Sequence, residues 1–143
     1  MNSFDHFNLS RFVEAQEQSY DIALQEIRQG YKQSHWIWYV FPQIKGLGYS
    51  SMAQFYAIQS LDEAKAYLQH PLLRAHLIEI TEALLLHSNQ SAEQIFGYID
   101  AVKVRSSMTL FNFVEPNSLF QRVIDVFYNG IADDKTLRIV SLN

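Results

Sequence analysis

The chain has 143 residues, 48% of them hydrophobic and 18% charged, with no cysteine and a formal net charge of −4. A chain of this length and composition buries a substantial core without metal or disulfide staples, so we expect one globular domain over residues 1–143. The lack of cysteine excludes a disulfide scaffold and a thiol nucleophile, and the acidic balance argues against broad nucleic-acid binding, which requires a basic face.

The N-terminal segment predicts two consecutive helices. The first is expected to begin near Ser10, a residue type that suits a helix N-cap. Ser19 is expected to cap the second, in which apolar residues recur with helical spacing. That pattern stops at Gly30, and glycine commonly follows the last residue of a helix.

The segment 34–56 is the most aromatic part of the chain and holds both tryptophans, Trp36 and Trp38. Residues 35–41 are apolar on both faces, and at this length a buried strand and a buried helical turn look alike. A helix is favoured because the neighbouring segments are helical and because Pro42 marks a natural end.

A short helix is expected after the glycine-containing turn that follows this aromatic block. Ser50 or Ser51 would cap it, and Gln54, three residues after Ser51, would complete a capping box.

Six further helices are expected downstream, bounded by caps, prolines and glycines. Their spans are 61–69 with Asp62 as the cap, 72–86, 91–97 capped by Ser91, 100–113, 117–130 capped by Asn117, and a C-terminal helix capped by Asp133 or Asp134. The longest carries a regular apolar stripe of Leu73, Leu77, Ile80 and Leu84, widened by Ile78, Leu85 and Leu86. We therefore predict a single compact all-α domain of about seven to nine short helices.

Several function classes are not indicated by the sequence. The motifs of phosphate-binding loops, dinucleotide-binding folds, zinc proteases and serine hydrolases are missing, and no cofactor is expected. The five histidines are scattered, so no metal site is predicted. No secretory signal and no apolar run of membrane-spanning length is visible, so we expect a cytoplasmic protein without a membrane partner.

The best candidate site lies in the segment 100–111. On a helix, Lys103 shares one side with Ser106 and Ser107, and Asp100 lies three residues before the lysine, within reach of its ammonium. Serine is a poor residue for a helix interior, so the pair is unusual. One interpretation is a pocket for an anion or for sugar hydroxyls. The alternative is a polar stripe in which the serines are small because another helix packs closely.

A second candidate is the turn that leads into the serine-capped helix. Its proposed ligand-binding residues are Gln43, Lys45, Gly46, Gly48 and Ser50. Glycine permits close backbone approach, and a helix N-terminus offers free N–H groups to a phosphate. The aromatic side chains before the turn, Trp36, Trp38 and Phe41, would form a wall on which a base stacks. The alternative is that these three side chains are simply core.

Three blocks of the sequence carry a family resemblance: HWIWYVFPQIKGLGYSSMAQFYAIQSLDEAKAYLQHPLLRAHL, IFGYIDAVKVRSSMTLF and the DDKTL tail. They resemble the uncharacterised DUF1810 family, often labelled calpastatin-like, over roughly Phe4 to Val140. The calpastatin label implies nothing here, because inhibitors of that kind are disordered and this composition is globular. Two family positions differ: a glycine near Arg74 is missing, and Val104 replaces the usual leucine.

The same blocks are distantly similar to the NADAR group, helical domains linked to ADP-ribose and riboflavin-pathway chemistry in which N-glycosidic bonds are cleaved. The likeness lies in a Trp/Phe-Pro block, a serine-led helix after a glycine turn, and a late helix with lysine and methionine. That group is associated with a glutamate in the serine-led helix, whereas residues 50–54 contain no acid. Asp100 is then the nearest substitute carboxylate.

The resemblance implies binding of a nucleotide or ADP-ribose-like small molecule, with N-glycosidic hydrolysis as the reaction expected of an enzyme. In this hypothesis Lys45 and Lys103 meet phosphate, and Ser106 and Ser107 bind ribose hydroxyls. Asp100 is the catalytic residue, acting as a general base or stabilising an oxocarbenium ion.

Two alternatives remain open: a non-catalytic small-molecule-binding module that uses the same pocket, and a protein-interaction domain whose aromatic side chains are all core. A pocket that places Lys103 beside Trp36 or Trp38 would favour a small-molecule site. A solvated Lys103 far from any cleft would favour the interaction domain. The sequence does not indicate an oligomeric state.

Overall fold

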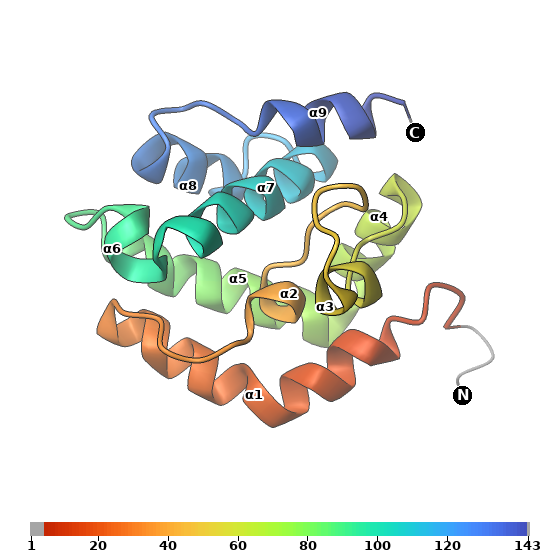
Figure 1. Ribbon diagram of the computed structural model, residues 1–143, viewed down its shortest axis with the longest axis horizontal. Coiled ribbons are helices and arrows are strands. Elements are labelled where there is room, and N and C mark those ends of the chain that lie inside the picture. The colour runs from red at the N-terminus through yellow and green to blue at the C-terminus, as the bar shows by residue number, and fades with distance from the viewer. Residues whose placement is uncertain (1–4, 143) are drawn as a thin grey trace.

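Nine α-helices form within residues 5–142, the part of the chain that the computed structural model describes (Figure 1). They are α1 (Ser10–Gln29), α2 (Ile37–Val40), α3 (Ser51–Phe55), α4 (Leu61–Gln69), α5 (Pro71–Leu85), α6 (Ala92–Phe96), α7 (Tyr98–Val114), α8 (Leu119–Phe127) and α9 (Asp134–Val140). The β-structure within those residues is one isolated bridge between Ile44 and Ile58. The all-α prediction is confirmed. Residues 1–4, among them Phe4, and residue 143 lie outside the described range.

Helix α1 is one continuous helix, so the predicted break at Ser19 is wrong. The Ser19 hydroxyl accepts a hydrogen bond from the Tyr39 hydroxyl (2.9 Å) and is therefore used in a tertiary contact, not in a cap. The buried face of α1 runs on both sides of this position, through Phe12 and Ile27. Burial of one long apolar face outweighs the weak helix propensity of a single serine. The predicted stop at Gly30 is confirmed, with a φ of 79°.

Local caps were predicted well at some helices and misplaced by one or two residues at others. Ser91 forms a full capping box with Gln94. Helix α4, however, is capped by Ser60 and not by Asp62, because the serine hydroxyl accepts from the Glu63 amide. Helix α8 is likewise capped by Ser118, one residue after the predicted cap.

The caps of α3 and α9 settle two alternatives that the sequence left open. Ser50 caps α3 through a bond from the Ala53 amide. The predicted capping box between Ser51 and Gln54 is absent, because the cap lies one residue earlier and the third helical position is then Ala53, which has no side-chain acceptor. The Gln54 side-chain amide donates to the Tyr49 carbonyl. Asp133, not its neighbour, caps α9.

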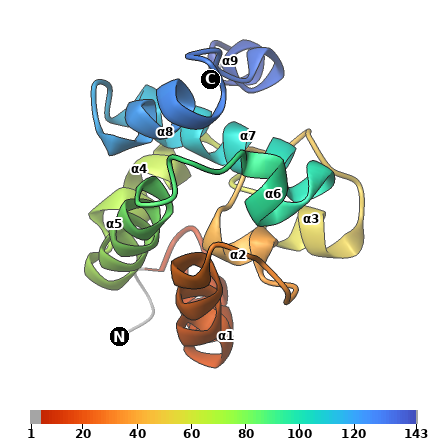
Figure 2. The ribbon, with the colours of Figure 1, turned by 90° about the vertical axis from the view of Figure 1, so that its left-hand side faces the viewer.

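Helices α5 and α7 form the centre of the fold. Helix α5 contacts α1, α4 and α8, and α7 contacts α2, α4, α6, α8 and α9. Figures 1 and 2 show α1 at one end of the molecule and α9 at the opposite end, with α5 and α7 between them. The predicted stripe on α5 is confirmed as core: Leu73, Leu77, Ile80 and Leu84. Leu86 was wrongly included, because the helix ends before it and its side chain is 81% exposed.

The segment 41–50 joins α2 to α3 and runs toward α9 in Figure 1. Gly46 has a φ of +107°, a conformation that L side chains rarely adopt, and a Cβ there would lie 3.3 Å from the Ile139 side chain. A Cβ on Gly48 would lie 2.7 Å from the Ala53 Cβ. The two glycines therefore let this loop pack tightly between α3 and α9.

The helices of the structure can be compared with the prediction that the chain has no membrane-spanning segment. None of those within residues 5–142 combines the length and the apolar character needed to cross a bilayer.

Candidate functional site

Two adjoining cavities lie on either side of the loop between α2 and α3. The first, about 470 Å³, is bounded by that loop, by the segment around α3 and by Trp38. The second, about 410 Å³, is bounded by the same loop, by α7 and by the start of α9. Four residues line both cavities: Gln43, Leu47, Gly48 and Ala53. Each volume falls in the range of small-molecule sites, and we call the two together the cleft.

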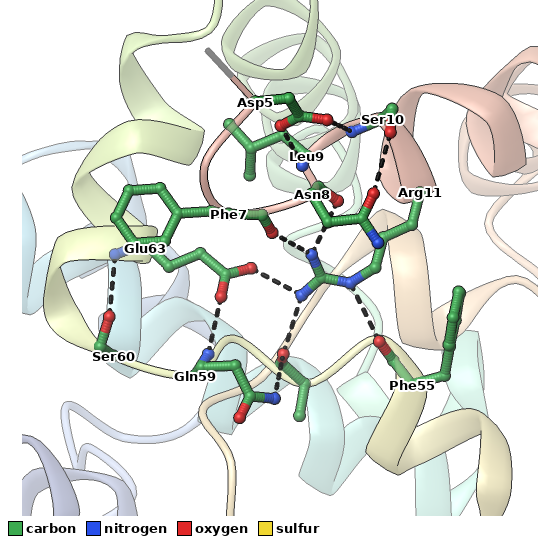
Figure 3. Close-up of polar contacts among 11 residues, drawn as sticks. Asp5, Phe7, Asn8, Leu9, Ser10, Arg11, Phe55, Gln59, Ser60 and Glu63 are labelled. Carbon is green, nitrogen blue, oxygen red and sulfur yellow. Dashed lines mark hydrogen bonds and ion pairs between the residues drawn. The ribbon is translucent and has the colours of Figure 1, made fainter. Parts of the chain in front are cut away.

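The buried ion pair between Arg11 and Glu63, shown in Figure 3, holds residues that line one side of the cleft. The Arg11 guanidinium of α1 contacts the Glu63 carboxylate of α4 at 2.6 Å and donates to the Phe55 and Ala57 carbonyls, both at 2.9 Å. The second Glu63 oxygen accepts from the Gln59 amide at 3.0 Å. Ala57 and Gln59 line the first cavity. The pair therefore anchors the chain after α3 to the body of the protein.

Trp38 and Lys103 meet where the two cavities adjoin. Trp38 lines the first cavity and Lys103 lines the second. The Lys103 ammonium lies 5.3 Å from the Trp38 ring centroid, within cation–π range. It pairs with the Asp100 carboxylate at 3.6 Å and makes no hydrogen bond within residues 5–142, so the ammonium keeps donors for a ligand.

Asp100 lies behind Lys103 and does not line either cavity. One of its oxygens pairs with Lys32 at 2.7 Å and the other with Lys103. Sequence reasoning found the Lys103 partner from helical spacing but missed Lys32, because that residue lies in the irregular segment after α1 and no local pattern connects it to α7. The carboxylate is thus held between two ammonium groups, away from the space where a ligand would bind.

Three predicted ligand-binding side chains belong to the core and not to the cleft. Trp36, Phe41 and Ser107 are 1%, 0% and 0% exposed. The predicted stacking wall is therefore reduced to Trp38. For Ser107 the close-packing alternative holds, and its hydroxyl has no hydrogen-bond partner within the described residues.

Trp36 is held inside by a buried carboxylate. Its indole Nε1 donates to Glu26 at 2.8 Å, and the same side chain accepts from the Gln33 amide and from the Ser34 amide and hydroxyl. Burial alone would raise the pKa of Glu26, but these four donors together hold the pKa below its ordinary 4.5. The carboxylate stays ionised because the surrounding donors replace its hydration.

Ser106 enters the cleft, but its hydroxyl is engaged by protein groups. Its single hydroxyl proton is shared between the Val102 carbonyl and Asp133 Oδ2, both at 3.2 Å. Asp133 lines the second cavity beside Lys103. The sequence identified Asp133 only as a cap, because its other role depends on contact with α7, which no spacing indicates.

The predicted turn residues divide between cleft and surface. Gln43, Lys45, Gly46 and Gly48 all line the first cavity. Ser50 lines neither cavity and is exposed, with its hydroxyl used as the α3 cap. No group of three or more His, Asp or Glu side chains among residues 5–142 is arranged to hold a metal ion.

Comparison with known proteins gives a family without a described activity. Residues 6–140 match DUF1810, described as a protein of unknown function. The structure is similar to the crystal structure of the conserved hypothetical protein Rv1873 from Mycobacterium tuberculosis, with a TM-score of 0.93 and 43% sequence identity. That match covers 96% of this chain and 99% of the other. No curated protein matches the chain.

Proposed function

We propose that this chain, which belongs to the DUF1810 family of proteins of unknown function, binds an anionic small molecule that carries an aromatic ring, such as a nucleotide. The observation that carries the proposal is the position of Lys103. Its ammonium has unused donors, lines the second cavity and lies over the ring of Trp38, which lines the first. An aromatic face beside a partly exposed cation matches a ligand whose ring and negative charge are close together.

The first cavity suits the ring of such a ligand. Trp38, Tyr49 and Tyr56 supply aromatic faces, and Gln43 and Gln59 supply amide groups. Amides both donate and accept, as the edge of a nucleobase requires. Aromatic stacking on a base contributes about 1–3 kcal/mol per base.

The second cavity suits the anion. It contains two lysines, Lys103 and Lys135. A phosphate placed between them would receive charge-assisted hydrogen bonds from both. Because the two cavities share the loop residues around Gly48, one ligand can occupy both.

We propose binding without assigning turnover to Asp100. This carboxylate is outside both cavities and is engaged by two lysines, so it lacks the contact with a reacting atom that a general base needs. Non-catalytic binding is therefore the better supported form of the hypothesis. The distant resemblance to the NADAR group makes ADP-ribose a natural probe, and product analysis after incubation would reveal any N-glycosidic cleavage.

The test is calorimetric titration of the wild type and of Lys103→Met with AMP and with ADP-ribose. We expect the substitution to weaken binding about tenfold or more, because a hydrogen bond to a charged group contributes roughly 1.5–3 kcal/mol. The matched control is Lys65→Met, which removes an exposed lysine of α4 that lines neither cavity. Absence of binding by the wild type, or equal loss in both variants, would contradict the proposal.

A further inference from the structure

Asp133 is the one carboxylate among the described residues that line the cleft. It stands at the start of α9, across the second cavity from the loop between α2 and α3, and its side chain is partly exposed. Its presence in a cavity with Lys103 and Lys135 needs an explanation, because a carboxylate repels the anion that two lysines would attract.

The two oxygens of Asp133 have different surroundings. Oδ2 accepts three hydrogen bonds: from the Thr136 amide at 3.1 Å, from the Thr136 hydroxyl and from Ser106 at 3.2 Å. Oδ1 accepts none within residues 5–142. One oxygen therefore fixes the side chain. The other has no hydrogen-bond partner among the described residues and belongs to a residue that lines the second cavity, so it can accept from a ligand there.

We propose that Asp133 Oδ1 accepts hydrogen bonds from the hydroxyls of a ribosyl group, so that the ligands of the cleft are ribosylated anions. This inference rests on the proposed function, because it assigns the middle part of a ligand whose ring lies on Trp38 and whose phosphate lies on the lysines. Vicinal hydroxyls are donors that a carboxylate binds well, and a carboxylate rejects a phosphate in the same place. Asp133 thus selects the sugar and also orients the anion toward Lys103.

Ser106 has a positioning role in this arrangement. Its hydroxyl donates to the oxygen that is already bound by Thr136, and so it fixes the rotation of the carboxylate from the side of α7. The sequence-based expectation of direct contact between this serine and the ribose is replaced by contact through Asp133.

If Asp133 served only as the cap of α9, replacing it with asparagine would leave ligand binding unchanged. Helix α9 needs only an acceptor for the Thr136 amide, which asparagine also supplies as a good N-cap. Asp133→Asn keeps that acceptor and replaces the other oxygen with an amino group, which cannot accept from a hydroxyl. This substitution therefore separates the cap from the binding role.

The experiment compares AMP with 2′,3′-dideoxy-AMP, which has the same base and phosphate but lacks both ribosyl hydroxyls. We expect the wild type to bind AMP about tenfold or more tightly, because hydrogen bonds to a charged acceptor are strong. In Asp133→Asn the two affinities should agree within about twofold, and the affinity for the dideoxy compound should not fall below the wild-type value, because the substitution also removes the carboxylate's repulsion of the phosphate. Ser106→Ala should reduce the preference in part, and it serves as the second variant if Asp133→Asn is poorly folded.

The matched control is Asp134→Asn, which neutralises the adjacent carboxylate, 80% exposed and paired with Arg138 outside the cavity. This variant should keep the wild-type preference for AMP over 2′,3′-dideoxy-AMP. Equal binding of both nucleotides by the wild type, or an unchanged preference in Asp133→Asn, would overturn this inference and leave the proposed function standing. Failure of the wild type to bind either compound would overturn both.

Discussion

The two tryptophans lie two residues apart, and each has a lysine close to its ring, yet they belong to different kinds of region. The Lys32 ammonium lies 5.0 Å from the Trp36 ring centroid, and the Lys103 ammonium lies 5.3 Å from that of Trp38. Both lysines pair with the same carboxylate, Asp100. The residue types and the distances to the rings are nearly the same on the two sides, whereas the ion pair with Asp100 is shorter for Lys32 (2.7 Å) than for Lys103 (3.6 Å).

The region around Trp36 is closed. The Lys32 side chain is 7% exposed and donates to the Ser34 carbonyl as well as to Asp100, and the Trp36 indole donates to Glu26. The region around Trp38 is open, because Lys103 is 25% exposed, lines a cavity and makes no hydrogen bond within the described residues. Burial and the number of satisfied donors, not residue type, therefore separate a structural cluster from a binding site.

The largest difference in stability is expected between the alanine variants of the two tryptophans. Trp36→Ala should lower the free energy of unfolding by about 3–5 kcal/mol, because it empties a fully buried site. Trp38→Ala should cost less than half as much, because the side chain is only partly buried against the core. Denaturant unfolding of both variants measures the difference, and equal losses would mean that both rings are core.

The next largest difference in stability is expected between the methionine variants of the two lysines. Lys32→Met should lower the free energy of unfolding by roughly 1–3 kcal/mol, less than the 3–5 kcal/mol typical of a stranded buried charge, because Asp100 keeps Lys103 as a partner. Lys103→Met should change it by less than about 1 kcal/mol, as is usual for a partly exposed ion pair. The same unfolding measurement tests both, and a reversed order would contradict the distinction between closed and open regions.

The Glu26 carboxylate should give the closed region a pH dependence. Because the folded pKa of Glu26 lies below 4.5, its contribution to stability is present above pH 4.5 and is lost as the pH falls through the folded pKa. Glu26→Gln should therefore lower the free energy of unfolding by roughly 1–2 kcal/mol at pH 7, the cost of a poorly satisfied buried donor. The difference in the free energy of unfolding between the wild type and Glu26→Gln should become smaller below pH 4.5. A gap that stays constant down to pH 3 would show that the charge contributes nothing.

The helices could be predicted from the sequence because their signals are local. Gly30, Ser91 and the stripe around Leu77 act within one or two turns of their own position, and each was placed correctly. The failure at Ser19 has a tertiary cause, since a partner from α2 takes its hydroxyl.

The candidate site was predicted only in part, because contacts between distant segments decide it. Helical spacing correctly joined Lys103 to Asp100, and the aromatic block correctly included Trp38. Nothing local distinguishes Trp38 from Trp36, which differ in burial through the contact with Glu26. Lys32 and Asp133 reach α7 from irregular segments far along the chain, so no periodicity indicated either contact.

The most direct test of the account uses the fact that the chain has two tryptophans and so two indole N–H signals. Proton–nitrogen correlation spectra of the labelled protein would be recorded during titration with ADP-ribose, with Trp38→Phe used to assign the signals. We predict that the Trp38 indole signal shifts progressively and saturates, whereas the Trp36 signal, held by Glu26, stays in place. A shift confined to Trp36, or no shift of either signal at saturating ADP-ribose, would contradict the assignment of the cleft beside Trp38 as the binding site.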